Sequence, residues 1–568
     1  MKVINGIGVG EDIRISKAFL LQTPEINISN EPASNVDTEL ATFNKALELT
    51  KEQINQIKTA SSDKLSAEQL GVFDAHLMIV SDPELVNNVT NMINEGNNAI
   101  FSIDTVCNNF ISMFSAMEDE YFKQRASDVA DIRTRLLSNA CGIKIPDLTL
   151  IDEECVLISY DLTPSETAQL NKEFVQGFVT SIGGRTSHAC IMAKSMGIPA
   201  LVGCGEMINE INDQDTVIID TVNSKLIVNP DESTLNEYQT LIAKLREQQE
   251  FEKSFKDKES ITKDGVKKII ASNIGTPQDA IGAVENGAEA IGLFRSEFLY
   301  MDKTELPSED EQFEAYKSVL ETMNGKQVIV RTLDIGGDKE LDYLNIEAES
   351  NPFLGYRAIR ICLDQTDIFK TQLRALVRAS AYGNLGIMFP MIATIDELRD
   401  AKKILEEVKQ ELINEGVEIG DKIEVGMMIE IPSACIMADV FAKEVDFFSI
   451  GTNDLIQYTM ACDRMSEKVS YLYQPYNPAV LRMINIAIKA AHESGIWIGM
   501  CGEMASDPLA QLILLAMGLD EFSMSSSNIL QSRANFANLN VGDLVPHLDN
   551  ILNLTTSEEV EEYVKTIK

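Results

Sequence analysis

The sequence predicts a multidomain α/β protein whose C-terminal part is a closed (β/α)8 barrel of the TIM type. Two observations carry this prediction. The chain has 568 residues, too many for one ordinary hydrophobic core, so we expect two to four domains. From Val266 onward, short apolar segments alternate strictly with long amphipathic ones, as in repeated β–α units.

The C-terminal region contains eight candidate strands, and eight β–α units over roughly 300 residues match the size of a closed parallel barrel. Amphipathic segments such as 312–323 and 395–413 separate them as helices would. An open, doubly wound sheet is the alternative. The candidate strands are Lys268–Asn273, Ala290–Phe294, Gln327–Thr332, Gly386–Met391, Val425–Glu430, Phe447–Ile450, Trp497–Met500 and Glu521–Met524.

The N-terminal part combines two kinds of segment. Alternating apolar and polar residues in 1–20 predict short strands, and strand patterns return at 156–159, 178–180 and 200–203. A hairpin-like pair, 216–220 and 225–228, follows them. Between Asp37 and Cys141 the pattern is helical, with helix stops and starts at 81–83 and Gly96. We therefore expect a helical bundle inserted into an α/β domain.

The domain boundaries follow from these patterns. Residues 231–262 are rich in Glu, Gln and Lys, which predicts a charged connecting helix that buries little and contains a hinge. The expected organisation is an α/β domain formed by 1–20 and 145–230, a helical insert at 21–144, the connector at 231–262 and the barrel at 263–568.

Composition limits the cellular setting and the partners. The net charge of −40 argues against nucleic acid and anionic lipid, and it is compatible with a basic protein partner or with solubility alone. No apolar run of about 18 residues predicts a membrane span, and the first residues do not resemble a secretory signal. The nine cysteines include no Cys-x-x-Cys pair and predict free thiols in the cytoplasm.

The strongest local motif is Gly183-Gly184-Arg185-Thr186-Ser187-His188. It predicts a glycine turn followed by a helix that begins at Thr186 or Ser187, with His188 in the first turn. A helix start offers free N–H groups and a positive dipole end, both of which favour an anionic group. A histidine alone would be only a capping-turn residue, but the glycines, the arginine and two hydroxyls around His188 predict a phosphoryl-accepting nucleophile. His76, His492 and His547 have no such context, and we expect them to be surface or packing residues, with a partner contact open for His76.

Polar residues gather at the carboxyl ends of the candidate barrel strands, where barrels carry their chemistry. Arginine side chains there grip carboxylate or phosphate groups in bidentate fashion, so several of them predict a small, highly charged anion as ligand. The strand-end residues are Asn273, Arg295, Arg331, Asp334, Met391, Glu430, Asn453, Asp454 and Cys501, and Arg357 and Arg464 add two further guanidiniums.

Two residue types at this end suggest further chemistry. Glu430 and Asp454 follow neighbouring strands and can share one hard cation, for which Mg²⁺ is the best candidate, although the carboxylates could instead cap helices or pair with the arginines. Cys501, in Gly499-Met500-Cys501-Gly502, is either a buried structural thiol or a general acid or base.

Taken together, these segments resemble enzyme I of the bacterial phosphoenolpyruvate-dependent sugar phosphotransferase system. The resemblance covers essentially the whole chain and lies in the His188 segment and in five further signatures in the same order. Those signatures are Asp161–Thr167, Gly292–Leu299, Arg331–Lys339, Asp446–Leu455 and Met500–Glu503. The differences are mild and remove no chemical group: Cys190, Lys194 and Met465-Ser466 stand where the family usually has other residues.

The resemblance implies a role for each of these residues. His188 accepts the phosphoryl group of phosphoenolpyruvate on Nε2, Thr167 orients that histidine, and Cys501 protonates the enolate carbon to give pyruvate. Phosphoenolpyruvate is held by Arg295, Arg331, Asn453, Asp454 and Arg464, with Arg357 nearby, and Mg²⁺ by Glu430 and Asp454. The α/β domain is then a phosphohistidine domain that swivels between the barrel and the carrier, and the barrel is the dimerisation domain.

The implied acceptor is HPr, the small histidine phosphocarrier protein, which docks on the helical insert. No Lys or Arg occurs between Lys64 and Lys123, which predicts an acidic surface for a basic partner. Glu68 and Asp74 are the expected contacts.

The sequence argues against three other functions. A pyruvate phosphate dikinase or phosphoenolpyruvate synthase needs an ATP-binding domain, for which the first 150 residues leave no room. A nitrogen-branch paralogue usually carries an added sensory domain at its N-terminus. A non-catalytic protein is expected to have lost His188, Glu430, Asp454 or Cys501, and all four are present.

Overall fold

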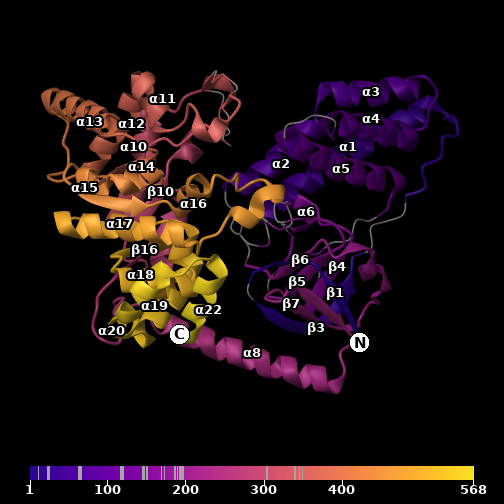
Figure 1. The fold of residues 1–568 in the computed structure, drawn as a ribbon. Coiled ribbons are helices and arrows are strands. Elements are labelled where there is room, and N and C mark those ends of the chain that lie inside the picture. Colours follow the sequence, from indigo (N-terminus) through magenta and orange to yellow (C-terminus); the bar gives the residue numbers. More distant parts are fainter. Residues whose placement is uncertain are drawn as a thin grey trace. The chain divides into compact units, whose positions relative to one another are not determined.

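The computed structural model describes residues 1–10, 12–21, 26–61, 67–115, 120–143, 148, 151–167, 169–171, 173–184, 187, 190, 193, 197–301, 303, 305–337, 341–344, 346–347 and 349–567. The chain divides into two compact units, Met1–Glu247 and Gln248–Lys568 (Figure 1). Each unit has its own hydrophobic cores, and each is described by itself.

The first unit contains one sheet whose strands come from two distant parts of the sequence. The sheet order is β1-β8-β7-β3-β4-β5-β6-β2. Strand β3 pairs in parallel with β4, which lies more than a hundred residues later, and antiparallel with β7. Separate apolar clusters cover the two faces of the sheet. The strands are β1 (Lys2–Asn5), β2 (Ile7–Val9), β3 (Ile13–Leu20), β4 (Cys155–Ser159), β5 (Val175–Thr180), β6 (Ala200–Val202), β7 (Thr216–Asp220) and β8 (Lys225–Val228).

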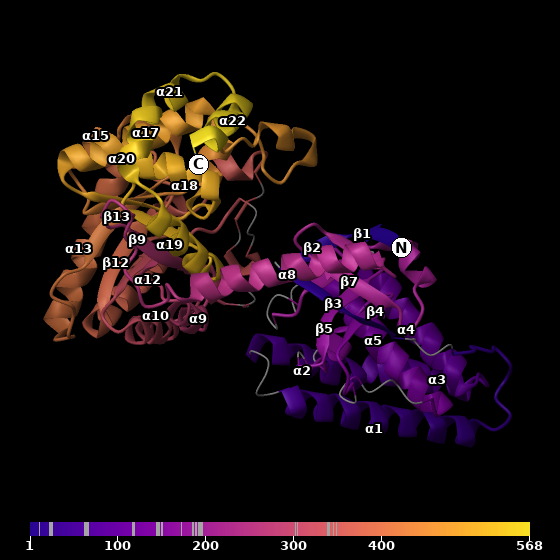
Figure 2. The same cartoon turned by 90° about the horizontal axis from the view of Figure 1, so that it is seen from below.

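Between β3 and β4 the chain forms a group of helices that pack side by side (Figures 1 and 2). Phe43, Phe73, Val89, Ile103 and Ile132 are fully or almost fully buried in their common core. The helices are α1 (Val36–Ser61), α2 (Ala67–Val80), α3 (Pro83–Asn94), α4 (Ala99–Ser115) and α5 (Glu120–Cys141).

Two further α-helices follow strands of this sheet. The short helix α6 (Pro164–Thr167) follows β4, and the long helix α8 (Glu232–Lys253) follows β8. Tyr238 of α8 is buried with Ile13, Ile218 and Ile227, and its hydroxyl donates a hydrogen bond to Asp220 Oδ2 at 3.0 Å. The N-terminal half of α8 is therefore packed against the sheet.

The second unit is a closed barrel of eight parallel strands in the order β9 to β16, with β16 pairing back onto β9. This confirms the predicted barrel and excludes the open sheet. Strand β12 ends two residues earlier than predicted because Pro390 has no N–H for the ladder. The strands are β9 (Ile269–Ile274), β10 (Ile291–Arg295), β11 (Gln327–Arg331), β12 (Asn384–Phe389), β13 (Glu424–Ile429), β14 (Phe447–Ile450), β15 (Trp497–Met500) and β16 (Glu521–Met524).

Helices surround the barrel, and their ends carry the expected signals. Ser308 and Thr394 form capping boxes at the starts of α10 and α13, and Gly416, Gly495 and Gly518 end their helices in the left-handed conformation. The helices are α9 (Asp279–Glu285), α10 (Glu309–Met323), α11 (Ile359–Asp364), α12 (Thr366–Ala379), α13 (Ile395–Glu415), α14 (Pro432–Ile436), α15 (Ala438–Phe441), α16 (Thr452–Met460), α17 (Pro478–Ser494), α18 (Pro508–Met517), α19 (Ile529–Asn538), α20 (Val541–Leu544), α21 (Leu548–Asn553) and α22 (Ser557–Ile567).

The interior of the barrel is packed with side chains, so it is a core and not a pore. The interior is filled by Leu293, Ile329, Met388, Met428 and Phe447. The Phe447 ring stacks on the Trp497 ring, with 4.6 Å between the ring centres. A larger apolar cluster lies between the strands and the surrounding helices. In the part of the chain that the structure describes, no helix has the length and apolar character needed to cross a membrane.

Candidate active site

A cavity of about 290 Å³ lies at the carboxyl ends of the barrel strands. Arg295 and Arg331 are the last residues of β10 and β11, and Glu430 and Cys501 come directly after β13 and β15. The structure therefore brings together most of the residues predicted for the site. The cavity is lined by Leu293, Arg295, Arg331, Asp334, Arg357, Met428, Glu430, Gly451, Asn453, Asp454, Arg464, Cys501 and Gly502.

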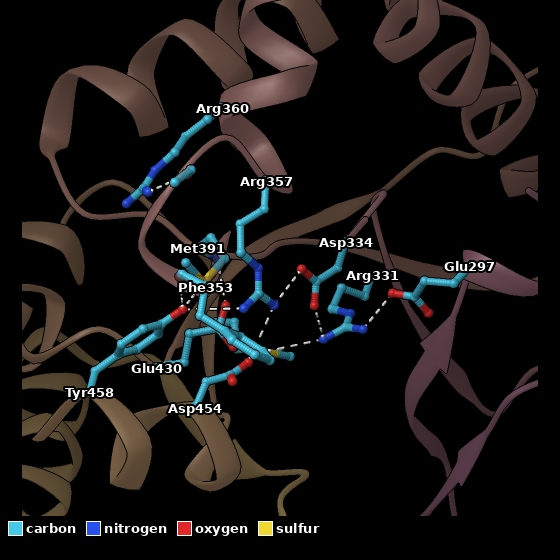
Figure 3. Close-up of polar contacts among 12 residues, drawn as sticks. Glu297, Arg331, Asp334, Phe353, Arg357, Arg360, Met391, Glu430, Asp454 and Tyr458 are labelled. Carbon is cyan, nitrogen blue, oxygen red and sulfur yellow. Dashed lines mark hydrogen bonds and ion pairs between the residues drawn. The ribbon is translucent and has the colours of Figure 1, made fainter. Parts of the chain in front are cut away.

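Asp334 joins two of the predicted arginines (Figure 3). Its carboxylate lies 2.8 Å from Arg331 Nη1 and 2.8 Å from Arg357 Nη2, and Glu297 lies 2.5 Å from Arg331 Nη2. Burial alone would lower the pKa of Arg331, but Asp334 and Glu297 outweigh it and hold the pKa above its usual value. Both buried guanidiniums are thus fixed in place and neutralised before any ligand binds.

Arg357 is held by aromatic residues as well as by acids. Its Nη1 lies 3.2 Å from the Tyr458 hydroxyl, and its guanidinium lies 5.7 Å from the centre of the Phe353 ring. The Tyr458 hydroxyl donates to the carbonyl of Phe353 at 2.5 Å, which ties the segment after β11 to helix α16 (Figure 3). These contacts fix one wall of the cavity.

Arg295 and Arg464 differ from this buried pair. Among the residues that the structure describes, neither guanidinium makes a hydrogen bond or ion pair, and Arg295 is exposed. Their charge faces the same cavity and is free for an anionic ligand. A carboxylate or phosphate would supply the acceptor oxygens that these guanidiniums lack.

Glu430 and Asp454 form the acidic part of the cavity. The Met391 N–H donates to Glu430 Oε1 at 2.6 Å, from a backbone with φ of 58°, which is rare for a residue with a side chain. Asp454 Oδ1 is buried and has no hydrogen-bond partner among the described residues. Burial raises the pKa of Glu430 to about 8, and repulsion from Asp454 adds to the rise.

These properties fit a cation. Two buried carboxylates that repel each other, one with an unpaired oxygen, are stabilised by a positive ion between them. No group of three or more His, Cys, Asp or Glu residues in the described ranges could enclose a metal by itself. A hard ion that keeps water or substrate oxygens as its other ligands, such as Mg²⁺, fits two carboxylates.

Cys501 lies in the cavity with little exposed surface. Burial raises the pKa of its thiol, while the Ser449 hydroxyl and the Arg331 and Arg295 guanidiniums oppose the rise. A raised pKa keeps the proton on sulfur at neutral pH, which is the form a general acid needs. All nine cysteines of the chain are free thiols in the structure.

The predicted nucleophile and one predicted docking residue cannot be placed. His188 lies outside the described residues, as does the side chain of Glu68. Near the motif, Gly183 has φ of 115°, and the described residues Cys190 and Ala193 are helical and buried. Thr167, the predicted orienting residue, is fully buried, and its hydroxyl donates to the Thr163 carbonyl at 2.8 Å.

The structure places two acidic residues and one histidine of the helical group. Asp74 is exposed, but it pairs with Lys58 of α1 at 2.5 Å, and Asp104 pairs with Arg133 of α5. At these two positions, bases from outside the stretch between Lys64 and Lys123 offset part of the predicted acidic charge. His76 is fully buried 3.2 Å from Asp128, so it is a packing residue and its side chain is not available to a partner.

Sequence reasoning did not assign roles to four residues of the cavity region. Asp334 and Glu297 hold Arg331, Tyr458 holds Arg357, and Met391 holds Glu430. Asp334 and Met391 were recognised only as strand-end residues, and Glu297 only as part of the Gly292–Leu299 signature. Their function as supports for charged neighbours depends on side-chain geometry that spacing does not reveal.

Three sequence models of phosphoenolpyruvate-utilising enzymes match the chain. The N-terminal model matches residues 5–125, the mobile-domain model 151–223 and the model of the phosphoenolpyruvate-binding domain 249–541. The last of these covers all eight barrel strands and the residues that line the cavity. Fold and site thus define an enzyme that uses phosphoenolpyruvate.

Curated relatives narrow this class. The phosphoenolpyruvate-protein phosphotransferase of Priestia megaterium is 52% identical to this chain, over 100% of this chain and 99% of its own length. That of Staphylococcus carnosus is 52% identical, over 99% of both chains. That of Geobacillus stearothermophilus is 53% identical, over 99% of this chain and 98% of its own length. The chain belongs to the phosphoenolpyruvate-protein phosphotransferase family, enzyme I, and is an enzyme of phosphoenolpyruvate-dependent phosphotransfer. A solution NMR structure of an Enzyme I protein is 41% identical over 43% of this chain and 99% of its own, with a TM-score of 0.39.

Proposed function

We propose that this enzyme transfers the phosphoryl group of phosphoenolpyruvate to its own His188 and then to the histidine phosphocarrier HPr, releasing pyruvate as the first step of sugar phosphotransfer. The observation that carries the proposal is the barrel cavity, in which four arginines, three carboxylates and a protonated thiol line one small space. Each of these groups has a use in cleaving phosphoenolpyruvate, and full-length relatives carry the corresponding name.

The arginines divide the binding of substrate between them. Arg331 and Arg357 are fixed by Asp334, so their remaining donors point in set directions. Arg295 and Arg464 have no partner among the residues that the structure describes, and they take the negative charge of the incoming ligand. Asn453 and Asp454 line the same wall. Preorganised positive charge stabilises the phosphoryl group as its bond to the enolate oxygen loosens.

Glu430 and Asp454 would hold Mg²⁺. When bound, the ion neutralises charge on the oxygens of the substrate. The assignment of Mg²⁺ to this pair rests on two observations. The two carboxylates repel each other, and Asp454 Oδ1 has no hydrogen-bond partner among the described residues. Isothermal titration with Mg²⁺ should give one site in the enzyme and none in Glu430→Gln, and equal binding by both would contradict the assignment.

The reaction needs one nucleophile and one acid. The bond between phosphorus and the enolate oxygen breaks as phosphorus bonds to a nitrogen of His188. The methylene carbon of the enolate then takes the proton from Cys501 Sγ, which forms a C–H bond and leaves a thiolate. Thr167 is the proposed orienting residue of His188.

Transfer to a second protein requires His188 to leave the barrel. We propose that 1–20 and 145–230 form the mobile phosphohistidine domain, 21–144 the docking insert, 231–262 the hinge and 263–568 the barrel. The match of residues 151–223 to a mobile domain supports this division, as does the exposed stretch Arg246–Phe251 of α8.

HPr is proposed to dock on the helical insert, where Asp74, Asp82, Glu84 and Glu95 are exposed. Glu68 belongs to the same proposed surface. Because Asp74 is already paired with Lys58, we expect Asp74→Lys to slow transfer to HPr mainly at low salt. Asn94→Lys, on the same group of helices, controls for added positive charge, and equal transfer by wild type and Asp74→Lys would place docking elsewhere.

A homodimer through the barrel and a cytoplasmic location complete the proposal. Ile436, Met437 and Ile486 are exposed on α14, the turn after it and α17, which pack against one another, and a second barrel would cover them. Sedimentation of Ile486→Glu should show a shift toward monomer, and an unchanged mass would contradict this face. The nine free thiols suit a reducing compartment.

Labelling tests the central proposal. The enzyme incubated with [³²P]phosphoenolpyruvate and Mg²⁺ should acquire an acid-labile, base-stable label, and His188→Ala should acquire none while still binding phosphoenolpyruvate at the barrel. Stoichiometric labelling of His188→Ala would refute the nucleophile. His492→Ala is the matched control and should label like the wild type, since His492 lies at the other end of the barrel, against Asp520.

A further inference from the structure

Cys501 lies just beyond the end of strand β15, where the ladder no longer fixes the backbone. Its N–H still donates to the Ile450 carbonyl of β14 at 3.1 Å. Its carbonyl accepts from Asn273 Nδ2 of β9 at 2.9 Å. Strand β9 is not a neighbour of β15, because β16 lies between them. A side chain from across β16 therefore replaces the missing ladder bond at the candidate proton donor.

The orientation of the Asn273 amide is fixed by its surroundings. Ser523 of β16 donates its hydroxyl to Asn273 Oδ1 at 2.6 Å, and the Ser523 carbonyl lies 3.4 Å from Asn273 Nδ2. A flipped amide would place its oxygen against two carbonyl oxygens, those of Cys501 and Ser523. The nitrogen must therefore face Cys501, and Ser523 secures that orientation.

The other side of Cys501 is held as tightly. A Cβ on Gly502 would lie 1.8 Å from Thr452 Oγ1, so only glycine lets this segment pack against the start of α16. The Glu503 N–H donates to Asn453 Oδ1 at 3.3 Å. The segment with Cys501 is thus held on one side by Asn273 of β9 and on the other by Asn453 of α16. The position of Cys501 is therefore sensitive to the loss of either hydrogen bond.

We propose that Asn273, oriented by Ser523, is a positioning residue that sets the place of the Cys501 thiol for protonation of the enolate. The inference rests on the proposed function, in which Cys501 is the proton donor. Asn273 is not among the described residues that line the cavity, so it acts through Cys501. The proton passes from sulfur to one face of the enolate carbon, and misplacement of about 1 Å can cost on the order of 100-fold in rate.

Stereochemistry separates positioning from a merely structural role. A fixed thiol delivers its proton to one face of the enolate, whereas an enolate released unprotonated picks up a proton from water on either face. The experiment uses (Z)-3-deuterated phosphoenolpyruvate in tritiated water with the full-length enzyme, Mg²⁺ and HPr, and determines the configuration of the pyruvate methyl group. The variants are Asn273→Ala, Ser523→Ala and Cys501→Ala.

We expect Asn273→Ala to lower turnover about 100-fold and to give a nearly racemic methyl group, with Ser523→Ala between it and the wild type. Phosphoryl transfer from labelled His188 to HPr should be unchanged in both. Ser272→Ala is the matched control: Ser272 is the preceding residue of β9, is fully buried, and bonds the Ser526 hydroxyl, and this variant should keep one configuration.

Full stereoselectivity in Asn273→Ala, whatever its rate, would overturn the inference. If that variant fails to fold, full stereoselectivity in Ser523→Ala would overturn it instead. Cys501→Ala tells the two proposals apart. Selectivity retained in Cys501→Ala would refute the proton donor itself, whereas selectivity lost there but kept in Asn273→Ala refutes only the positioning role.

Discussion

The two buried guanidiniums at the barrel mouth, those of Arg331 and Arg357, each have a carboxylate in reach. Arg331 and Arg357 carry like charges and would repel each other in a site of low dielectric. Asp334 forms ion pairs with both, so one carboxylate offsets two cations. Since all three side chains are almost fully buried, none can be relieved by water when a partner is lost.

Replacing Asp334 should therefore be costly. Asp334→Asn keeps the shape of the side chain but leaves two buried guanidiniums with one fewer negative charge, and we expect a loss of about 3 to 5 kcal/mol in the free energy of unfolding. Urea unfolding of the full chain measures this loss. The fluorescence of Trp497, the single tryptophan of the chain, reports the barrel.

Glu309→Gln provides the control for this prediction. Glu309 also joins two arginines, Arg374 and Arg378, but on the surface of the barrel, where water screens the charges. We expect a change below about 1 kcal/mol for this variant. If Asp334→Asn and Glu309→Gln lower the free energy of unfolding equally, burial does not determine how much such an arginine–carboxylate–arginine bridge stabilises the barrel.

At the scale of elements, helix α8 is tied at both ends by different means. Tyr238 holds its first half to the sheet of the first unit. The segment after α8 is held to the barrel by Arg533 of α19, a fully buried arginine. Its guanidinium donates to Ser260 Oγ and to the carbonyls of Phe255, Lys256 and Gly287 at 2.5–3.1 Å. Between these anchors, residues 246–251 are exposed.

Arg533→Lys should loosen this anchor. A lysine ammonium cannot reach four oxygens spread across a planar guanidinium, so carbonyls that are buried or partly buried lose their partners, at up to about 1 to 3 kcal/mol each. We expect a glutamate-specific protease to cut at Glu252 or Glu259 at least about tenfold faster than in the wild type. Arg482→Lys is the control, because Arg482 donates a single hydrogen bond to the Leu552 carbonyl. The protease should cut this variant at the wild-type rate. Equal cutting of both variants would show that Arg533 does not secure the segment.

At the scale of the whole molecule, the two units have separate cores, and we expect them to unfold separately. The barrel also contains a buried acid that the proposed reaction does not use. Glu521 is 1% exposed, lies against Gly292 and Gly499, and neither carboxylate oxygen has a hydrogen-bond partner in the described part of the chain. Burial, with a smaller contribution from Asp520, raises the pKa of Glu521 from 4.5 to about 8.

This shift makes barrel stability depend on pH. Between pH 4.5 and about 8 the folded barrel keeps a proton on Glu521 that the unfolded chain has released. The free energy of unfolding contributed by this group is therefore greatest below pH 4.5 and falls as the pH rises toward 8, by up to about 1.4 kcal/mol per pH unit.

Glu521→Gln should remove that dependence, because an amide is neutral throughout the range. Urea unfolding of the full chain between pH 5.5 and 8, followed by Trp497 fluorescence and circular dichroism, measures the slope. Glu424→Gln is the control, since Glu424 already accepts hydrogen bonds from Gln327 and Trp497. An unchanged slope in Glu521→Gln would mean that this carboxyl ionises normally in the folded barrel.

The sequence by itself determined the fold class and most of the cavity. Eight apolar segments separated by amphipathic ones predict the barrel, and all eight became strands because the hydrophobic pattern fixes which residues can be buried on both faces of a parallel sheet. Strand ends in a barrel meet at one rim, so Arg295, Arg331, Glu430 and Cys501 could be placed together from their positions in the chain alone.

Only the tertiary structure decided which charges pair and which remain free. Asp334 between Arg331 and Arg357, and Asn273 on the Cys501 carbonyl, are contacts between elements distant in sequence, set by side-chain rotamers that no local pattern encodes. The same reason explains Asp74, which pairs with Lys58 although no Lys or Arg occurs between Lys64 and Lys123. Periodicity records burial, residue by residue, whereas pairing depends on distances across the fold.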